Sequence, residues 1–460
     1  MNRMVYFWCM IAGMLYLLLM LLPLALASGS LIARDQLRPG VVAGVFMVLL
    51  QLVVVGWAPS PPPAAWLGTT LLLQPFNEIL LGSWLLMVAG MLAALLLGTA
   101  EHRDPSVVLC MVGALAAALL VQQPSTIALL VLVVMLSGSM LLAGGAGERV
   151  ATRSPVVLGL RYVLAAVIGG VAIVAAHALA GMEALPTGIH AGLLLAGLGV
   201  WVVVLPMLLA LTPVAEQMSL PSFMLLVGAL PPVAGLLIGT TQFGPTATIA
   251  AVPLFAIIVL TCTMAVPLLA PPRPRRIMAL LLLANSGQLM VGPLLRSDYG
   301  LRGALLGSVA HALALSLVLP GIMLLEQAGG GSGRREPVTM AALLLGLLLL
   351  IGLPPLPGWY AKVELWYAAR EQTVLLPWLF GAGQALLVAG AARLALLRPE
   401  SLPVGRSTDR HIGGRAGLLS RAWLLLLIGG VLLSSFAVGP LIDRVGAATA
   451  ERAQFFGITR

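Results

Sequence analysis

The sequence is short of charged side chains and, above all, of lysine. Charged residues make up 9% of the 460 residues and hydrophobic residues 60%, and lysine occurs once, at Lys362. This composition excludes a soluble globular protein and is typical of a polytopic membrane protein. The net charge of +9 comes from arginines scattered over short loops, without a basic stripe or interleaved aromatics. We therefore expect a lipid bilayer, and no nucleic acid, as a partner.

Residues that bind metals and nucleotides are also scarce. The three cysteines lie far apart in apolar runs, and the five histidines show no metal-ligand spacing. An iron–sulfur, zinc or haem site is therefore not expected. A phosphate-binding glycine motif is missing as well. We expect no metal and no cofactor in this chain.

Apolar runs of about 20 residues predict an all-α fold with about fourteen membrane helices. The loops are short, so 1–460 is interpreted as a single membrane domain. The first run has the charged start and the Ala25-Leu26-Ala27 end of a signal peptide, but its length favours a membrane helix. The runs are 5–27, 40–57, 77–99, 106–123, 126–145, 156–180, 190–211, 221–240, 247–269, 276–296, 301–325, 338–371, 374–397 and 419–441.

The arginines alternate between the loops. Sixteen lie in loops after odd-numbered runs, whereas seven lie in loops after even-numbered runs and at the two termini. Because loops on the cytoplasmic side are enriched in Lys and Arg, the odd-numbered loops are expected in the cytoplasm. Both termini are then expected on the outer, periplasmic side of a bacterial inner membrane.

The run 338–371 is interrupted at Pro354, Pro355 and Pro357, shortly before Lys362. Proline removes a backbone donor, so the helix is expected to break there. An ionisable group at membrane depth is costly and usually functional, and lysine gives up a proton more readily than arginine. The alternative is that Lys362 lies near a helix end and extends to the lipid headgroups.

A second interruption is expected in the run 190–211, at Pro206. The interrupted runs seven and twelve lie five runs apart, which is typical of two inverted repeats of five helices in a transporter fold. We place the N-terminal helices at 1–105, the first repeat at 106–240, the second at 247–397 and the last helix at 419–441. The alternative is that these prolines simply bend membrane helices, where proline is common.

Five stretches carry a family resemblance in their order along the chain. They are Arg161-Tyr162 with the small residues up to Gly181, Gly197-Leu198-Gly199 through Pro206, Arg275-Arg276 through Asn285-Ser286-Gly287, His311-Ala312-Leu313, and LLIGLPPLPGWYAKVELWYAA at 349–369. Together they resemble the antiporter-like membrane subunits of respiratory complex I, of the N and M type, which are related to cation/proton antiporters and membrane-bound hydrogenases. The resemblance spans about 120–440.

The resemblance implies a membrane-arm subunit of a proton-pumping NADH:quinone oxidoreductase, itself without redox chemistry. The partners would be other membrane subunits, and NADH or a similar donor, flavin, iron–sulfur clusters and quinone would belong to partner subunits. Two alternatives stay open within this class: a degenerate structural subunit without its own proton path, or a subunit of a related hydrogenase or antiporter complex. A standalone transporter is the third possibility.

Several charged positions of the family are uncharged here. Val133 stands near the expected helix-five glutamate, and Trp201 and Ala229 stand at the helix-seven and helix-eight lysines. Asn285 stands at the helix-ten histidine or lysine. Of the central charges that the family carries, Lys362 remains.

Lys362 is therefore the expected proton site, with His311, Asn285 and Glu364 as further members of the pathway. His311 could relay protons near neutral pH, or its ring could instead bond a backbone carbonyl. Glu364, two residues after Lys362, is turned about 200° away on a helix and is a poor direct partner. Asn285, Ser286 and Gln288 could hold water, or could bond between helices.

Overall fold

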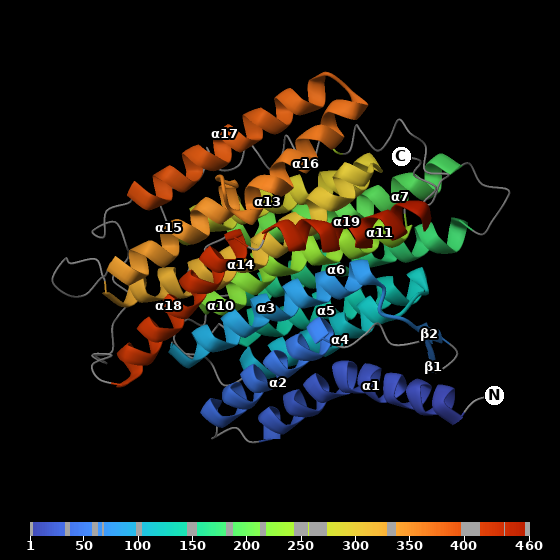
Figure 1. Cartoon of the computed structure of the whole chain (residues 1–460), viewed down its shortest axis with the longest axis horizontal. Coiled ribbons are helices and arrows are strands. Elements are labelled where there is room, and N and C mark those ends of the chain that lie inside the picture. The colour runs from blue at the N-terminus through green and yellow to red at the C-terminus, as the bar shows by residue number, and fades with distance from the viewer. Residues whose placement is uncertain are drawn as a thin grey trace.

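The protein is a bundle of long helices, shown in Figure 1. The computed structural model describes residues 3–32, 37–57, 63–66, 69–97, 104–144, 154–180, 187–211, 218–242, 256, 274–328, 337–396, 415–436 and 438–455. Within these ranges the chain is almost entirely helical. One antiparallel ribbon pairs β1 (Ala64–Trp66) with β2 (Thr69–Leu71). The all-α prediction is confirmed, with this small addition.

The described helices follow the apolar runs closely. Outside the expected run 247–269, which lies beyond the described residues except for Ala256, each run coincides with a helix. The first half contains α1 (Arg3–Ile32), α2 (Leu37–Trp57), α3 (Pro75–Leu97), α4 (Asp104–Leu120), α5 (Pro124–Gly144), α6 (Ser154–Ala180), α7 (Thr187–Gly199), α8 (Leu205–Leu211), α10 (Leu220–Met224) and α11 (Leu230–Gln242). The second half contains α13 (Pro274–Leu295), α14 (Asp298–Ala328), α15 (Pro337–Ile351), α16 (Pro357–Gln372), α17 (Leu375–Leu396), α18 (Arg415–Phe436) and α19 (Val438–Phe455).

Many of these helices can cross a membrane. Within the described residues, eight are long and apolar enough, and nine if α18 and α19, bent by 70°, form one span. Four shorter apolar helices, Met14–Ser28, Val41–Val55, Ser106–Leu120 and Pro337–Ile351, lie in other expected runs. The protein is thus a multi-pass membrane protein, whereas the count of fourteen and the two inverted repeats stay predictions.

The core of the bundle lies around α13 and α14. The apolar windows Leu220–Ile238 and Pro274–Leu295 are completely buried by the rest of the chain, whereas a third of the α17 window is buried. In Figure 1, α1 and α2 (blue) lie along one edge and α17 (orange) along the opposite edge. Side chains on α13 and α14 are therefore shielded from lipid on most sides.

Polar contacts tie together one end of the bundle. Gln74, just before α3, donates to Gln122, just before α5, at 3.1 Å. Arg452 of α19 donates to Gln74, and Arg444 forms an ion pair with Glu78 of α3. The loops after the second and fourth runs and the C-terminal helix thus lie at the same end.

Two helices near the core widen just before a proline. A π-helical segment, η1 (Val200–Val204), joins α7 to α8 and ends two residues before Pro206. A second π segment, η2 (Leu225–Ala229), joins α10 to α11 before Pro231 and Pro232. Proline cannot donate to the preceding turn, and a wider turn accommodates the lost bond. At Pro206 the chain therefore stays helical, and the expected break takes the form of a π segment.

Candidate functional site

The break in the run 338–371 lies where the prolines predict it. Gly352 follows α15 with a φ of 69°, which glycine tolerates at a helix end. The N–H of Gly352 donates to Leu349 O at 3.2 Å, and that of Leu353 donates to Leu348 O at 3.1 Å. This pair of bonds is the Schellman ending of a helix. The chain becomes helical again at Pro357, the first residue of α16.

Protein atoms cover part of the open backbone at this break, at the end of α15, while residues 353–355 are exposed. Gln384 of α17 donates a hydrogen bond to the carbonyl of Ile351, the last residue of α15. A side chain at Gly358 would lie 2.2 Å from the carbonyl oxygen of Leu349, so α15 and α16 approach closely here. Unpaired backbone at membrane depth requires such cover. The ends of α15 and α16 are therefore packed against each other and against α17, and the second turn of α16 faces α13.

Lys362 lies on this second turn and points into the bundle. Its side chain is 6% exposed. The amine donates to Asn285 Oδ1 at 2.6 Å and to Gln288 Oε1, both on α13. The structure therefore contradicts the alternative in which Lys362 extends to the lipid headgroups. A buried ammonium group needs acceptors of this kind, because desolvation without them is costly.

The hydrogen bonds continue from Lys362 toward the centre of the bundle. Asn285 Nδ2 lies 2.7 Å from His311 Nδ1 on α14, and His311 Nε2 lies 2.6 Å from the carbonyl oxygen of Gly228 in η2. Asn285, Gln288 and His311 are each at most 3% exposed. One continuous chain of bonds thus joins α16, α13, α14 and η2.

The donors and acceptors along this chain are fixed by chemistry. As the ammonium ion, lysine only donates, so the Asn285 oxygen faces Lys362 and its NH₂ group faces His311. A backbone carbonyl only accepts, so Nε2 of His311 carries a hydrogen and donates to Gly228. Nδ1 is then the acceptor for Asn285, and His311 is a neutral imidazole. His311 thus bonds a backbone carbonyl, as one of the two alternatives expected, and it also belongs to the Lys362 network, while its role as a proton relay stays a prediction.

Glycines allow the three helices of this site to approach one another. A side chain at Gly292 of α13 would lie 2.2 Å from the carbonyl oxygen of Gly300 on α14. A side chain at Gly303 of α14 would lie 2.9 Å from the carbonyl oxygen of Ala361 on α16. The backbones of α13, α14 and α16 are therefore close enough for short polar side chains to meet.

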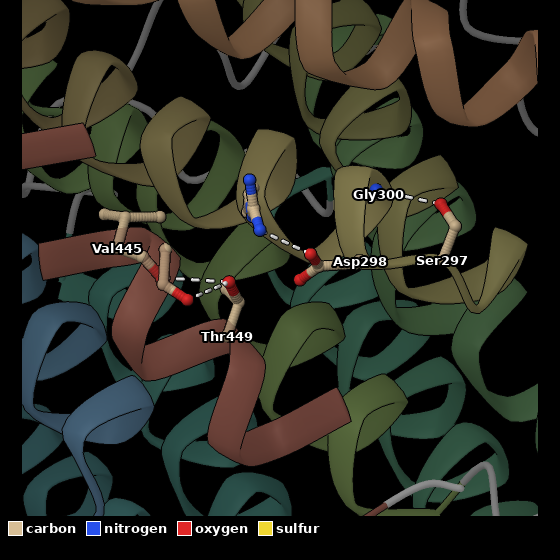
Figure 2. A network of polar contacts seen from close by, with 7 residues as sticks. Ser297, Asp298, Gly300, Val445 and Thr449 are labelled. Atoms are coloured by element: carbon tan, nitrogen blue, oxygen red, sulfur yellow. Dashed lines mark hydrogen bonds and ion pairs between the residues drawn. The ribbon is translucent and has the colours of Figure 1, made fainter. Parts of the chain in front are cut away.

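Glu364 lies apart from this network. The hydrogen bonds of Lys362 lead to α13, while the Glu364 carboxylate interacts electrostatically with Arg302 and Asp298 in the first turns of α14. Arg302 and Asp298 form an ion pair at 2.5 Å. Figure 2 shows this end of α14 together with α19, where Thr449 donates to the carbonyl of Val445 in its own helix. The helical spacing correctly indicated that Glu364 does not contact Lys362 directly.

The polar residues of α13 behave differently from one another. Ser286 donates to the Leu282 carbonyl in its own helix at 2.7 Å. Gln288, for which water binding and a bond between helices were both open, bonds Lys362 of α16 directly. The signal for this role is its position three residues after Asn285, which places both amides on one helix face. Nothing in the sequence indicated this role of Gly228, because its contribution is a backbone carbonyl, which every residue type carries.

The first half of the bundle lacks a comparable cluster in its described part. Between 106 and 240, the buried polar side chains that the structure describes are Ser106 and Ser222. Trp201 is fully buried and donates to the Ala166 carbonyl at 2.9 Å, while Val133 is 48% exposed. Among all described residues, no group of three His, Cys, Asp or Glu side chains could hold a metal ion. The ionisable site thus belongs to the second half.

Comparison with known proteins agrees with this architecture. No family model matches the chain. NADH-quinone oxidoreductase subunit N 2 of Acidobacterium capsulatum is 31% identical over 137 residues, which are 28% of this chain and 28% of that protein. The sequence match thus spans less than a third of that curated relative.

Three solved structures share the fold over nearly the whole chain. A chain of the Mrp complex from Dietzia sp. matches with a TM-score of 0.79 and 19% identity, over 96% of this chain and 98% of that chain. A chain of an archaeal membrane-bound sulfane sulfur reductase matches with a TM-score of 0.74 and 14% identity, over 98% and 100%. A chain of respiratory complex I from Thermus thermophilus matches with a TM-score of 0.68 and 18% identity, over 92% and 98%.

These matches place the chain in a structural class. It has the fold of membrane subunits found in multi-subunit membrane complexes. The predicted resemblance to an antiporter-like subunit of complex I is confirmed.

Proposed function

We propose that this chain is a membrane-arm subunit of a complex I-like NADH:quinone oxidoreductase and takes part in proton translocation coupled to quinone reduction. The observation that carries this proposal is the buried hydrogen-bonded chain from Lys362 to Asn285 and His311. Intramembrane ionisable residues of this kind are usually functional. NADH or a similar donor, flavin, iron–sulfur clusters and quinone would belong to partner subunits in a bacterial inner membrane, with both termini outside.

In this proposal, Lys362 binds and releases the proton. The oxygens of Asn285 and Gln288 stabilise the ammonium form, because they accept its hydrogens in a place without bulk water. A movement of α16 at the Gly352–Pro357 break would lengthen these bonds and favour release of the proton. Coupling then requires that a partner subunit move this break during the redox cycle.

The test is Lys362→Ala in the assembled complex, with proton uptake and donor oxidation measured together in membrane vesicles. The proposal predicts fewer protons moved per electron, while the complex still assembles. The control is Arg370→Ala, which removes an exposed cation in the last turn of the same helix. An unchanged ratio of protons to electrons for Lys362→Ala would contradict the proposal.

A structural subunit is the second candidate, and the apolar first half favours it. Trp201 fills the position at which the resemblance places a lysine, and its ring packs against Gly169 of α6. Under this reading the chain connects neighbouring subunits in the membrane arm, and Lys362→Ala lowers stability without changing the ratio of protons to electrons.

A related hydrogenase or antiporter complex is an alternative assembly, since a chain of the Mrp complex shares the fold. Co-purifying subunits would identify the assembly, and purification as a single polypeptide would favour a standalone transporter.

A further inference from the structure

The carbonyl of Gly228 lacks its ordinary helical donor. In an α-helix this oxygen accepts from the N–H four residues later, which here belongs to Pro232 and does not exist. Gly228 lies within η2, and the chain continues as α11 immediately afterwards. Pro232 thus removes the α-helical donor of a carbonyl in the buried core, where an unpaired carbonyl is costly.

His311 provides the missing donor from a different helix. Its Nε2 lies 2.6 Å from the Gly228 oxygen. The absence of a side chain at Gly228 makes this contact possible, since a Cβ there would lie 2.7 Å from Leu282 of α13 and 3.2 Å from Leu315 of α14. Leu315 is one turn after His311, so the same face of α14 packs against η2.

The bond to Gly228 determines how the rest of the network is oriented. Because Nε2 must carry the hydrogen, Nδ1 keeps its lone pair and accepts from Asn285 Nδ2. The Asn285 oxygen is then directed at Lys362. With the other tautomer, His311 Nδ1–H would attract the Asn285 oxygen, and the amide would turn its NH₂ group toward the lysine.

We propose that Pro232 is a positioning residue for the Lys362 site. By leaving the Gly228 carbonyl without its helical donor, Pro232 holds His311 as the Nε2–H tautomer and keeps the Asn285 oxygen on Lys362. The effect on proton movement rests on the proposed function, whereas the effect on the tautomer does not. Pro231 is the matched control, because the donor that it removes would serve Val227, which lies outside this network.

The first experiment reads the tautomer directly. The purified protein is labelled with ¹⁵N-histidine, and His311 is assigned as the signal that is missing from His311→Gln. The proposal predicts the Nε2–H form in the native protein and in Pro231→Ala. It predicts a mixture of both tautomers in Pro232→Ala, or in Pro232→Gly if the alanine variant does not fold. A pure Nε2–H signal in a folded Pro232 variant would overturn the proposal.

The second experiment asks whether Pro232 acts through His311. In the assembled complex, Pro232→Ala is expected to lower the protons moved per electron, by no more than the loss that Lys362→Ala causes. In a His311→Leu background the same change is expected to add nothing, because the residue on which it acts is gone. Independent, additive losses would contradict the proposal. A changed tautomer with an unchanged ratio would support the positioning role while contradicting the proposed function.

Discussion

Lys362 and Asn285 are 77 residues apart in the sequence, and their side chains meet at 2.6 Å in the buried core. The contact joins the second turn of the broken helix to α13, so it depends on where the chain resumes its helix after Gly352. Gln288 accepts from the same amine one turn further along α13. The amine of Lys362 is therefore bonded to two amide oxygens. Because these partners carry no charge, no ion pair has to be broken when the amine loses its proton.

The contact predicts a large effect for Asn285→Leu, which keeps the branched shape of the side chain but removes the acceptor. Hydrogen bonds to charged groups contribute about 1.5–3 kcal/mol, so the rate of proton translocation is expected to fall by about tenfold to a hundredfold. Ser286→Ala is the control, since Ser286 bonds a carbonyl in its own helix. Rates of proton uptake in vesicles check the prediction, and equal effects of the two variants would contradict it.

Gly352→Ala is expected to destabilise the protein strongly. A side chain with a φ of 69° costs about 1–2 kcal/mol, and here the added Cβ would also lie 2.8 Å from the Gly358 carbonyl oxygen and from Lys362 Cγ. Gly381→Ala on α17 is the control, because its Cβ would meet nothing within 4 Å. Thermal unfolding in detergent should show a clear loss for the first variant and none for the second.

Trp201→Phe separates a packing role from a role in proton movement. The loss of the indole bond to Ala166 should lower stability by about 1 kcal/mol, while proton translocation stays unchanged. Trp378→Phe serves as the control, since Trp378 is 75% exposed on α17 and should affect neither property. A lower ratio of protons to electrons in Trp201→Phe would show that the first half contributes to the path.

Arg452 and Arg444 both attach α19 to α3, but with different expected strengths. Arg452 is 6% exposed, donates to Gln74 and lies over the Phe76 ring, so Arg452→Ala is expected to cost about 1–3 kcal/mol. Arg444 is about half exposed in its ion pair with Glu78, and exposed ion pairs contribute about 0–1 kcal/mol. Chemical unfolding of the two alanine variants compares them. A larger loss for Arg444→Ala would contradict the contacts described here.

Local chemistry explains which features could be predicted from the sequence. The break before Lys362 follows from prolines and a glycine that act on their own turn, and the helices follow from the length of the apolar runs. The candidate partners of Lys362 could be proposed from the sequence, because amide and imidazole side chains are rare in the apolar runs. Which of them bonds to which could not be predicted, since this depends on the glycine contacts that bring α13, α14 and α16 together. The sequence predicted a break at Pro206, whereas the helix continues there through a π segment. The two outcomes could not be distinguished, because the same proline is compatible with either.

The central claim is that the single lysine amine is enclosed within the folded bundle. Treatment of the purified assembly with a water-soluble, amine-reactive reagent, followed by mass spectrometry of the peptide with Lys362, tests it directly. Arg370→Lys places a second amine at an exposed position of the same helix and provides the positive control. The structure predicts that the amine introduced at position 370 reacts in the folded protein, while Lys362 reacts after unfolding and not before. Equal reaction of both amines in the folded protein would contradict the enclosed proton site.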